Sequence, residues 1–325
     1  MYLITGGAGF IGSALIWHLN NMGIRDVVVV DFLGTDDKWR NLVTRDIVDV
    51  ISPKNWQTWL SQHSRKLKGI AHMGACSSTT ETNADFLIKN NVHESMEYFK
   101  VCTNYRVPLI YASSAATYGA REKQFYDTDE TTKSLKPINK YGYSKHLFDK
   151  WALQQNCHPP KWAGLKFFNV YGPNEYHKGA QASVALHAYP QVNENGILNL
   201  FKSYRQEFSD GEQRRDFVYI KDVVKVISHF LLSEESFENG LYNVGTGEAS
   251  SFNELAAACF KAVNKKTNIA YIEMPETLRA QYQYSTEADL SKLRAEGKYQ
   301  DDFTPLEEGV LDYYNNYIGK GKQTL

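Results

Sequence analysis

The sequence is poor in cysteine. Its 325 residues include four, Cys76, Cys102, Cys157 and Cys259, which lie far apart and form no CxxC pair. A disulfide framework needs a higher density of cysteine, and a zinc site needs ligands at close spacing. The sequence therefore predicts reduced thiols and no metal centre.

Long hydrophobic runs are also missing. No apolar stretch approaches the roughly 18–20 residues that a membrane-spanning helix needs. The first β-rich run begins at Tyr2, and we therefore expect no signal peptide. Together with the reduced cysteines, these absences predict a cytoplasmic protein.

Neither sign of charge is in excess. Lys and Arg total 36 against 37 Asp and Glu, which leaves a net charge of -1 with histidine neutral. This balance argues against a protein that binds nucleic acid through bulk charge and against a polybasic membrane binder. The hydrophobic fraction of 42% is enough for a sizeable core.

Short β-rich runs alternate with helical patterns over the first half of the chain. Apolar runs cover 2–5, 26–31, 69–73 and 108–114, and helical patterns cover 83–104 and 141–155. This alternation predicts an α/β fold of Rossmann type, with a doubly wound parallel sheet. Beyond about residue 170 the regularity fades. We expect a dinucleotide-binding domain over 1–170, with a return of the chain near 215–247, and a smaller, mostly C-terminal substrate-binding region over 171–325.

A glycine-rich segment follows the first predicted strand and opens the first predicted helix. Gly6, Gly9 and Gly12 satisfy GxxGxxG, and small residues let the backbone approach a pyrophosphate at a helix N-terminus. Asp31 ends the second strand, where a carboxylate normally accepts from the adenosine ribose and favours NAD. Lys38 and Arg40 follow in the next loop and are suited to a 2′-phosphate. The residues thus predict a dinucleotide site and leave NAD and NADP both open.

A serine, a tyrosine and a lysine form the candidate catalytic set. Ser114 closes the run 108–114, and Tyr141 and Lys145 lie four residues apart, on one face of the predicted helix 141–155. An ammonium beside a phenol favours the phenolate, so we expect the pKa of Tyr141 to fall below its usual value of about 10. Such a site can remove a proton from an alcohol while a nicotinamide accepts hydride.

These motifs resemble the extended short-chain dehydrogenase/reductase superfamily, whose members modify nucleotide sugars. The glycine loop and the Ser114, Tyr141 and Lys145 set are joined by further matching segments through nearly the whole chain. Within the superfamily, the resemblance is strongest to the epimerases that act on ADP-heptose for the lipopolysaccharide core. The matching segments are TGGAGFIG (5–12), GACSSTTE (74–81), YASSAATYGAR (111–121), FNVYGPNEYHKG (168–179), ASVALH (182–187), RDFVYIKDV (215–223) and YNVGTG (242–247).

The resemblance implies an NADP-dependent isomerase that epimerises C6″ of ADP-heptose by transient oxidation. It also implies a homo-oligomer such as a homopentamer, with no nucleic-acid or membrane partner. The implied cofactor contacts are Gly6, Gly9, Phe10, Ile11, Gly12, Asp31, Phe32, Lys38, Met73, Gly74, Ala75, Cys76, Ser77, Asn90, Lys145 and Val170. The implied substrate contacts are Asn169, His187, Phe201, Arg215 and Tyr282.

Lys178 is a catalytic candidate through the resemblance alone, because an isolated lysine in a polar loop is normally solvated. Arg215 is suited to the diphosphate, with a structural ion pair to a neighbouring acidic residue as the alternative. Three departures from the family pattern stand out: Met73 replaces a common glutamate, Ala180 a common serine, and the loop 202–214 is longer than usual.

Two other functions stay open. A UDP-hexose 4-epimerase would carry a similar serine, tyrosine and lysine set. A non-catalytic NADP-sensing module is the alternative from another class, and it would be expected to lack Tyr141 or Lys145, both of which are present.

Overall fold

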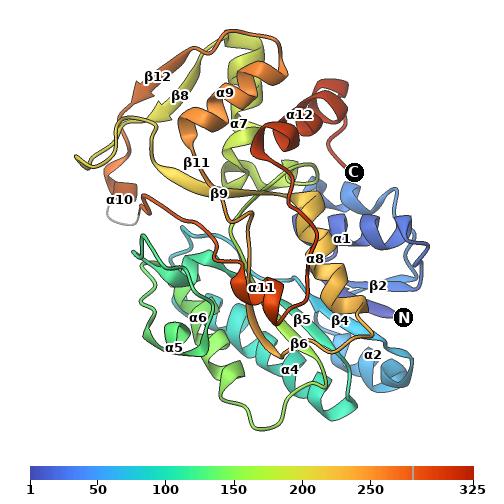
Figure 1. Ribbon diagram of the computed structural model, residues 1–325. Helices are drawn as coiled ribbons and strands as arrows, with labels where there is room; N and C mark the ends of the chain where they lie inside the picture. The colour runs from blue at the N-terminus through green and yellow to red at the C-terminus, as the bar shows by residue number, and fades with distance from the viewer. Residues whose placement is uncertain (280–281) are drawn as a thin grey trace.

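A seven-stranded parallel sheet forms the larger part of the molecule (Figure 1). The computed structural model describes residues 1–279 and 282–325. The sheet confirms the predicted Rossmann-type α/β fold. Its strands are β1 (Tyr2–Thr5), β2 (Val27–Val30), β3 (Asp49–Ile51), β4 (Gly69–His72), β5 (Leu109–Ser114), β6 (Trp162–Phe167) and β10 (Gly240–Val244), hydrogen-bonded in the order β10-β6-β5-β4-β1-β2-β3.

Helices cover both faces of this sheet, which is why its strands are apolar without alternation. Ile4, Val29 and Ile110 face one hydrophobic cluster, which includes α1 (Phe10–Asn21) and α8 (Ile220–Leu232). The neighbouring strand residues Leu3 and Val28 face the other cluster, with α2 (Trp56–His63), α4 (Glu94–Tyr105) and α6 (Lys140–Leu153). Successive side chains of a strand point to opposite faces, so each strand contributes to both clusters.

The strand order reverses between β1 and β4. The chain runs outward from β1 through β2 to β3, and then crosses to the other side of β1 to form β4, β5 and β6. In such sheets the crevice beyond the carboxyl ends of the strands at this reversal is where ligands bind. The glycine loop after β1 and Ser114 at the end of β5 both lie at this edge of the sheet.

A second, smaller body lies above this edge in Figure 1. Its sheets are three-stranded, in the order β11-β9-β7, and two-stranded, β12-β8. The chain passes from β9 through α8 back into the large sheet at β10. The strands and main helices of this body are β7 (Asn169–Tyr171), β8 (Leu198–Phe201), β9 (Arg214–Tyr219), β11 (Ala249–Ser251), β12 (Ile269–Ile272), α7 (Val184–Pro190), α9 (Phe252–Ala262) and α12 (Leu306–Asn316).

Short segments complete the chain. They are α3 (Ala84–Leu87), α5 (Asp129–Ser134), α10 (Glu276–Arg279) and α11 (Ser291–Ala295), with a π-helical turn at Ile88–His93 and 3-10 turns at Asp37–Leu42, Ala115–Tyr118 and Tyr176–Gln181 among others. The single predicted helix over 83–104 is therefore three helical pieces, because the turn around Asn91 widens to π geometry.

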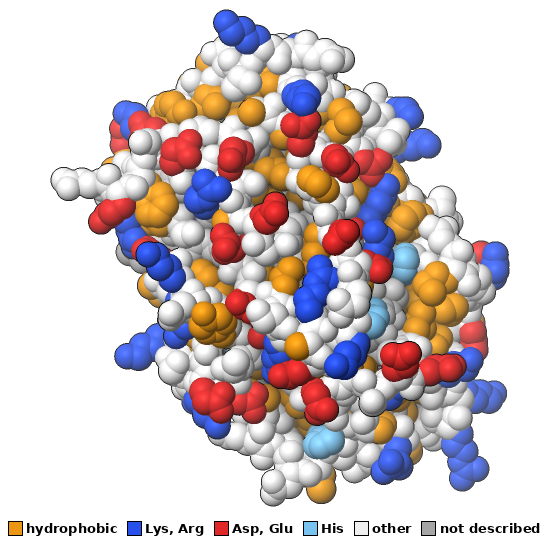
Figure 2. All heavy atoms as spheres, in the orientation of Figure 1, with side chains coloured by type: hydrophobic (Ala, Val, Ile, Leu, Met, Phe, Trp, Pro, Cys, Tyr) orange, Lys and Arg blue, Asp and Glu red, His pale blue; other side chains and the backbone are white. Residues whose placement is uncertain are grey.

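The surface carries both signs of charge. Figure 2 shows Lys and Arg interspersed with Asp and Glu over the face in view. Within residues 1–279 and 282–325, none of the helices is both long and apolar enough to span a membrane.

Candidate active site

The glycine loop after β1 is shaped for close contact. Gly6 has a φ of +63°, and a Cβ there would lie 2.7 Å from the backbone nitrogen of Gly74. A Cβ on Gly12 would lie 2.2 Å from the carbonyl oxygen of Gly6. Helix α1 begins with Gly9 as its N-cap, so no side chain occupies the N–H groups of its first turn. The loop therefore fits the pyrophosphate of a dinucleotide.

Asp31 and Lys38 form an ion pair at the end of β2. Lys38 Nζ lies 2.9 Å from Asp31 Oδ1, and the backbone N–H of Ala8 donates to Asp31 Oδ2 at 2.9 Å. The carboxylate therefore fixes the glycine loop. Phe32 is 54% exposed beside it. Arg40 instead pairs with exposed Asp37 at 3.2 Å.

A second loop, at residues 73–77, lies against the first. The N–H of Gly74 donates to Thr5 Oγ1 at 2.9 Å, at the end of β1. Asn91, which is fully buried, accepts from the N–H of Cys76 at 2.9 Å and donates to its carbonyl at 2.9 Å. Its side chain also donates to Ser144 Oγ in α6 at 3.0 Å. Asn91 was not predicted from sequence, although the asparagine doublet at 90–91 was a signal.

Most of the implied cofactor residues lie at one edge of the large sheet. They come from the segments that follow β1, β2 and β4, and from α6 and β7. Because β2, β1 and β4 are neighbours in the sheet, their carboxyl ends meet at that edge. Asn90 donates to Asn91 Oδ1 at 3.1 Å, which ties it to the loop 73–77. Val170 is partly buried and packs against the main core.

Ser114, Tyr141 and Lys145 come together at the end of β5. Asn139 caps α6 by accepting from the N–H of Gly142 at 2.7 Å, which places Tyr141 in the first turn. Tyr141 hydrogen-bonds with Ser114. Lys145 Nζ donates to the carbonyl of Ala112 in β5 at 2.9 Å. The serine, the phenol and the ammonium thus share one buried corner.

The pKa of Tyr141 is raised, opposite to the direction expected from its spacing to Lys145. Burial disfavours the phenolate, and the hydrogen bond with Ser114 only partly offsets this effect. Burial lowers the pKa of Lys145 to about 8, with Asp149 opposing the shift. The spacing of four residues predicts that Tyr141 and Lys145 share a helix face, but it does not predict that the phenol is buried.

Lys178 lies against the glycine loop. Its Nζ is 5.3 Å from the centre of the Phe10 ring, at the first residue of α1. Burial lowers its pKa, and nearby Glu175 opposes this shift. The lysine is therefore a partly desolvated cation that faces the dinucleotide loop, although it comes from the segment after β7.

Arg215 and Tyr282 meet in the smaller body. The Arg215 guanidinium is 7% exposed and lies 5.0 Å from the centre of the Tyr282 ring and 5.7 Å from that of Phe252. Arg215 donates to the carbonyl of Arg214, whereas Asp216 accepts from Thr246, Gly247 and Ala288. The alternative of an ion pair between Arg215 and Asp216 is thus not what this structure shows.

The other implied substrate residues are less closely grouped. Phe201 ends β8, and its carbonyl accepts from Gln213, two residues before Arg215, at 3.5 Å. Asn169 at the start of β7 and His187 in α7 are exposed. Among the residues that the structure describes, no hydrogen bond or ring contact joins Asn169 or His187 to Arg215.

His72 is a core residue. It is 4% exposed, it hydrogen-bonds Thr5 and Ser95 through its two ring nitrogens, and burial lowers its pKa to about 3. No cluster of three or more His, Cys, Asp or Glu suited to a metal occurs within the described ranges 1–279 and 282–325.

Comparisons with known proteins show the family. The chain matches the model of the NAD dependent epimerase/dehydratase family over residues 2–245. An ADP-L-glycero-D-manno-heptose-6-epimerase of Fusobacterium nucleatum is 48% identical to it over 330 aligned positions, which span 98% of each chain. A protein of the same description from Nitratidesulfovibrio vulgaris is 48% identical over 320 residues, again 98% of each chain.

Solved structures agree. The ADP-L-glycero-D-manno-heptose-6-epimerase of Helicobacter pylori superposes with a TM-score of 0.80 at 29% identity, over 97% of this chain and 95% of that one. A UDP-glucose 4-epimerase of Thermotoga maritima superposes with a TM-score of 0.79 at 25% identity, over 98% and 99%. The resemblance predicted from the motifs is confirmed: this chain belongs to the NAD dependent epimerase/dehydratase family.

Proposed function

We propose that the chain is an isomerase that interconverts ADP-D-glycero- and ADP-L-glycero-β-D-manno-heptose at C6″, for the lipopolysaccharide core. The observation that carries this function is identity of 48% over 98% of the chain to two ADP-L-glycero-D-manno-heptose-6-epimerases. The corner formed by Ser114, Tyr141 and Lys145 provides the acid and base groups that the reaction needs.

C6″ bears a secondary hydroxyl outside the sugar ring, so its oxidation gives a ketone that can rotate about the exocyclic bond. A bound nicotinamide dinucleotide supplies the hydride acceptor and donor for this chemistry. Tyr141, bonded to Ser114, exchanges a proton with the C6″ oxygen. Lys145, held on the carbonyl of Ala112, keeps a positive charge beside it.

Inversion places the C6″ oxygen in different positions in the substrate and the product. One fixed residue cannot easily serve both positions, and we assign the second to Lys178. Its Nζ approaches the Phe10 ring at the edge of the glycine loop. Burial lowers the pKa of this lysine, which favours its release of a proton at neutral pH.

We assign substrate binding to Asn169, His187, Phe201, Arg215 and Tyr282. A buried guanidinium is suited to bidentate contact with a diphosphate. Arg215 meets this description and is held between the Tyr282 and Phe252 rings. It therefore needs no large side-chain movement to present a fixed positive charge.

An assay with purified protein tests the function. ADP-D-glycero-β-D-manno-heptose should equilibrate with its C6″ epimer, which NMR distinguishes, whereas UDP-galactose should not change. Turnover of UDP-galactose alone would favour a UDP-hexose 4-epimerase. Turnover of neither nucleotide sugar, with cofactor still bound, would favour a non-catalytic NADP-sensing module.

We further propose that the cofactor is NADP. Lys38 neutralises Asp31 at 2.9 Å, which removes the repulsion that a free carboxylate would exert on a 2′-phosphate. In Lys38→Ala, Asp31 would regain its free charge, and the ratio of NADP to NAD affinity should fall about tenfold or more. Arg40→Ala is the matched control. An unchanged ratio in Lys38→Ala would contradict the assignment.

The active protein is proposed to be a homo-oligomer, with a homopentamer as the expected form. Sedimentation velocity of the cofactor-loaded protein measures this directly, and a single monomeric species would contradict it.

A further inference from the structure

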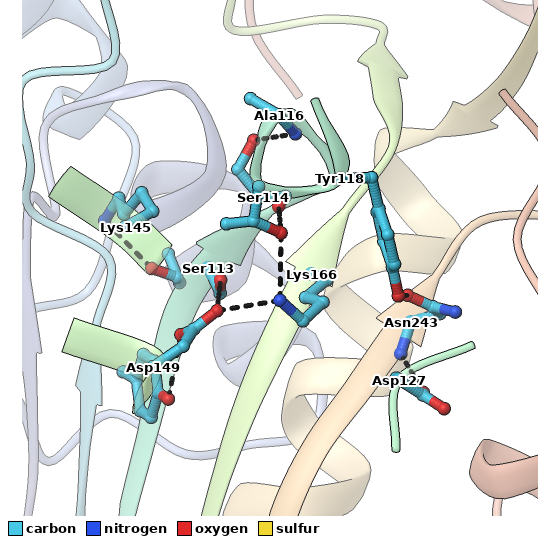
Figure 3. Close-up of polar contacts among 12 residues, drawn as sticks. Ser113, Ser114, Ala116, Tyr118, Asp127, Lys145, Asp149, Lys166 and Asn243 are labelled. Carbon is cyan, nitrogen blue, oxygen red and sulfur yellow. Dashed lines mark hydrogen bonds and ion pairs between the residues drawn. The ribbon is translucent and has the colours of Figure 1, made fainter. Parts of the chain in front are cut away.

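Behind the catalytic corner lies an ion pair that the proposed reaction does not use. Lys166 Nζ in β6 lies 2.8 Å from Asp149 Oδ2 in α6, and both side chains are 0% exposed. Figure 3 shows the two side chains pointing toward one another, with Ser113 of β5 beside Asp149. Stability does not explain it well, because replacing a buried ion pair with apolar residues is often neutral or stabilising.

The spacing along α6 places Asp149 in line with the catalytic set. Tyr141, Lys145 and Asp149 are each four residues apart, so they follow one face of the helix. Across the sheet, Ser113 of β5 is directly opposite Lys166 of β6. The helix and the two strands thus bring the pair next to Ser113, the residue before Ser114.

Each of the last four residues of β5 is held by a hydrogen bond or a short chain of hydrogen bonds. Three of these residues bond directly to a side chain of α6. The Tyr111 hydroxyl donates to Asp149 Oδ1 at 3.1 Å, and the Ser113 hydroxyl donates to Asp149 Oδ2 at 2.6 Å. The carbonyl of Ala112 accepts from Lys145 at 2.9 Å.

The fourth link passes through Thr117. Lys166 Nζ donates to Thr117 Oγ1 at 2.9 Å, and Thr117 Oγ1 donates to the carbonyl of Ser114 at 2.8 Å. Thr117 is 0% exposed, so water does not compete for these bonds. The serine that bonds Tyr141 is therefore connected to the ion pair by its own backbone.

We propose that Asp149 and Lys166 are positioning residues for the proposed epimerase reaction: they fix Ser114 and keep Lys145 in its charged form. Neither residue touches the reacting atoms. Asp149 acts through Ser113 and through its charge on Lys145, and Lys166 acts through Thr117.

The electrostatics support the role of Asp149. Burial lowers the pKa of Lys145 to about 8, and the largest opposing influence is the negative charge of Asp149. From β4, neutral His72 also faces Lys145, and Tyr141 faces it from α6. Without Asp149, the pKa of Lys145 should fall further.

The groups around Asp149 itself are Lys166 from β6 and Tyr111 from β5, with Tyr118 from the turn after β5 and His146 from α6. The pKa of Tyr111 and of Tyr118 is raised, chiefly by burial, so both are neutral. Lys166 is thus the cation that balances Asp149 directly.

The central experiment is Asp149→Asn in the cofactor-loaded protein. The ammonium of Lys145 is present below its pKa, so a lower pKa moves the alkaline limb of kcat to lower pH, by about one unit or more. Titration of the ¹³Cε signals of lysine by NMR, with Lys145→Arg to assign the signal, should show the same shift. A folded variant in which the alkaline limb of kcat and the titration of Lys145 are both unchanged would overturn the proposal.

Because Asp149→Asn leaves Lys166 without its partner, the double variant Asp149→Asn/Lys166→Met keeps the test decisive if the single variant fails to fold. Loss of the buried charge should restore the melting temperature, while the shift of the Lys145 titration persists. A double variant with the wild-type profile would contradict the inference.

Asp222→Asn is the matched control, since Asp222 is also 0% exposed and paired with a lysine, but in α8 on the other face of the sheet. Its profile should equal that of the wild type.

Thr117→Val tests the second link without creating an unpaired charge. It should lower kcat by up to about tenfold, as expected for one hydrogen bond, with KM and the titration of Lys145 unchanged. An unchanged kcat would remove Thr117 and Lys166 from the positioning role.

If the wild type fails to turn over ADP-heptose, the proposed function fails, whereas the NMR titration still decides whether Asp149 sets the charge of Lys145.

Discussion

At the scale of the residue, Tyr141 is a phenol that is buried and bonded to one hydroxyl. Burial raises its pKa, so the neutral form is the resting form, and the site must supply positive charge when the proton moves. Lys145 is the resident source of that charge. Serine alone cannot replace the phenol, because its hydroxyl is a weaker acid.

Replacement of Tyr141 by Phe should therefore lower kcat by about 10²–10⁴, the usual effect of losing a general acid or base. The bound cofactor, measured by mass spectrometry of the native protein, should be retained. Tyr143→Phe is the matched control, since Tyr143 is 51% exposed on the same helix. Activity within a fewfold of wild type in Tyr141→Phe would remove this residue from its assigned role.

Lys178 is expected to matter as much as Tyr141. Lys178→Met keeps the length of the side chain beside the Phe10 ring but removes the proton. If the two residues serve the two positions of the C6″ oxygen, kcat for epimerisation should fall by about 10²–10⁴ here too. Lys100→Met, on the exposed surface of α4, controls for the loss of a charge. A variant that epimerises normally would show that Tyr141 serves both positions.

At the scale of the element, the turn between β1 and α1 depends on close packing within its own backbone. A Cβ on Gly12 would lie 2.2 Å from the carbonyl oxygen of Gly6, whereas one on Gly9 would lie 3.2 Å from the same atom. Gly12→Ala must therefore reshape the loop, at a cost of about 1–3 kcal/mol. Cofactor affinity should fall about tenfold or more. The affinity of both variants is measured by fluorescence titration of the cofactor. Gly9→Ala should lower it less than Gly12→Ala does, and the reverse order would contradict this account of the loop.

The sequence was sufficient to predict the elements whose patterns are local. Four apolar runs predicted β1, β2, β4 and β5, because strands that are buried on both faces are apolar throughout. The position of Ser114 at a strand end followed from these runs, and that of Tyr141 in a first helical turn followed from the helical pattern at 141–155. The short strand pairs β12-β8 and β11-β9 were not predicted, since each is only three to six residues long and depends on distant partners.

The buried polar residues were the least predictable part of the site. Asn91, Asp149 and Lys166 belong to polar residue types that are normally placed at the surface, and nothing in the sequence reports that they are buried. Their roles come from contacts across wide separations in the chain, such as that between Asn91 and Ser144. The direction of the Tyr141 pKa shift was wrong for the same reason, because spacing along a helix does not report burial.

At the scale of the whole molecule, the two bodies hold different parts of the proposed reaction. The large sheet carries the glycine loop, Ser114, Tyr141 and Lys145 at one edge, and the smaller body carries Arg215 and Tyr282. Lys178 connects the two, because it follows β7 in the chain but lies over Phe10 of α1. If Arg215 holds the diphosphate as proposed, the sugar must reach the sheet edge for Tyr141 to meet C6″.

This arrangement makes a prediction about the hydrogen on C6″. If the oxidised sugar stays between the two bodies until it is reduced, the hydrogen that leaves C6″ returns to the same carbon, on its opposite face. Turnover in D₂O should then place no deuterium at C6″, and substrate deuterated at C6″ should keep its label in the product when the reaction runs in H₂O. Protons on Tyr141 and Lys178 do exchange with water, but they reach only the oxygen. Both experiments are read by NMR after the two epimers have equilibrated. Solvent deuterium at C6″ would mean that the carbon itself is deprotonated, and Tyr141 and Lys178 would then have to be reassigned as carbon bases.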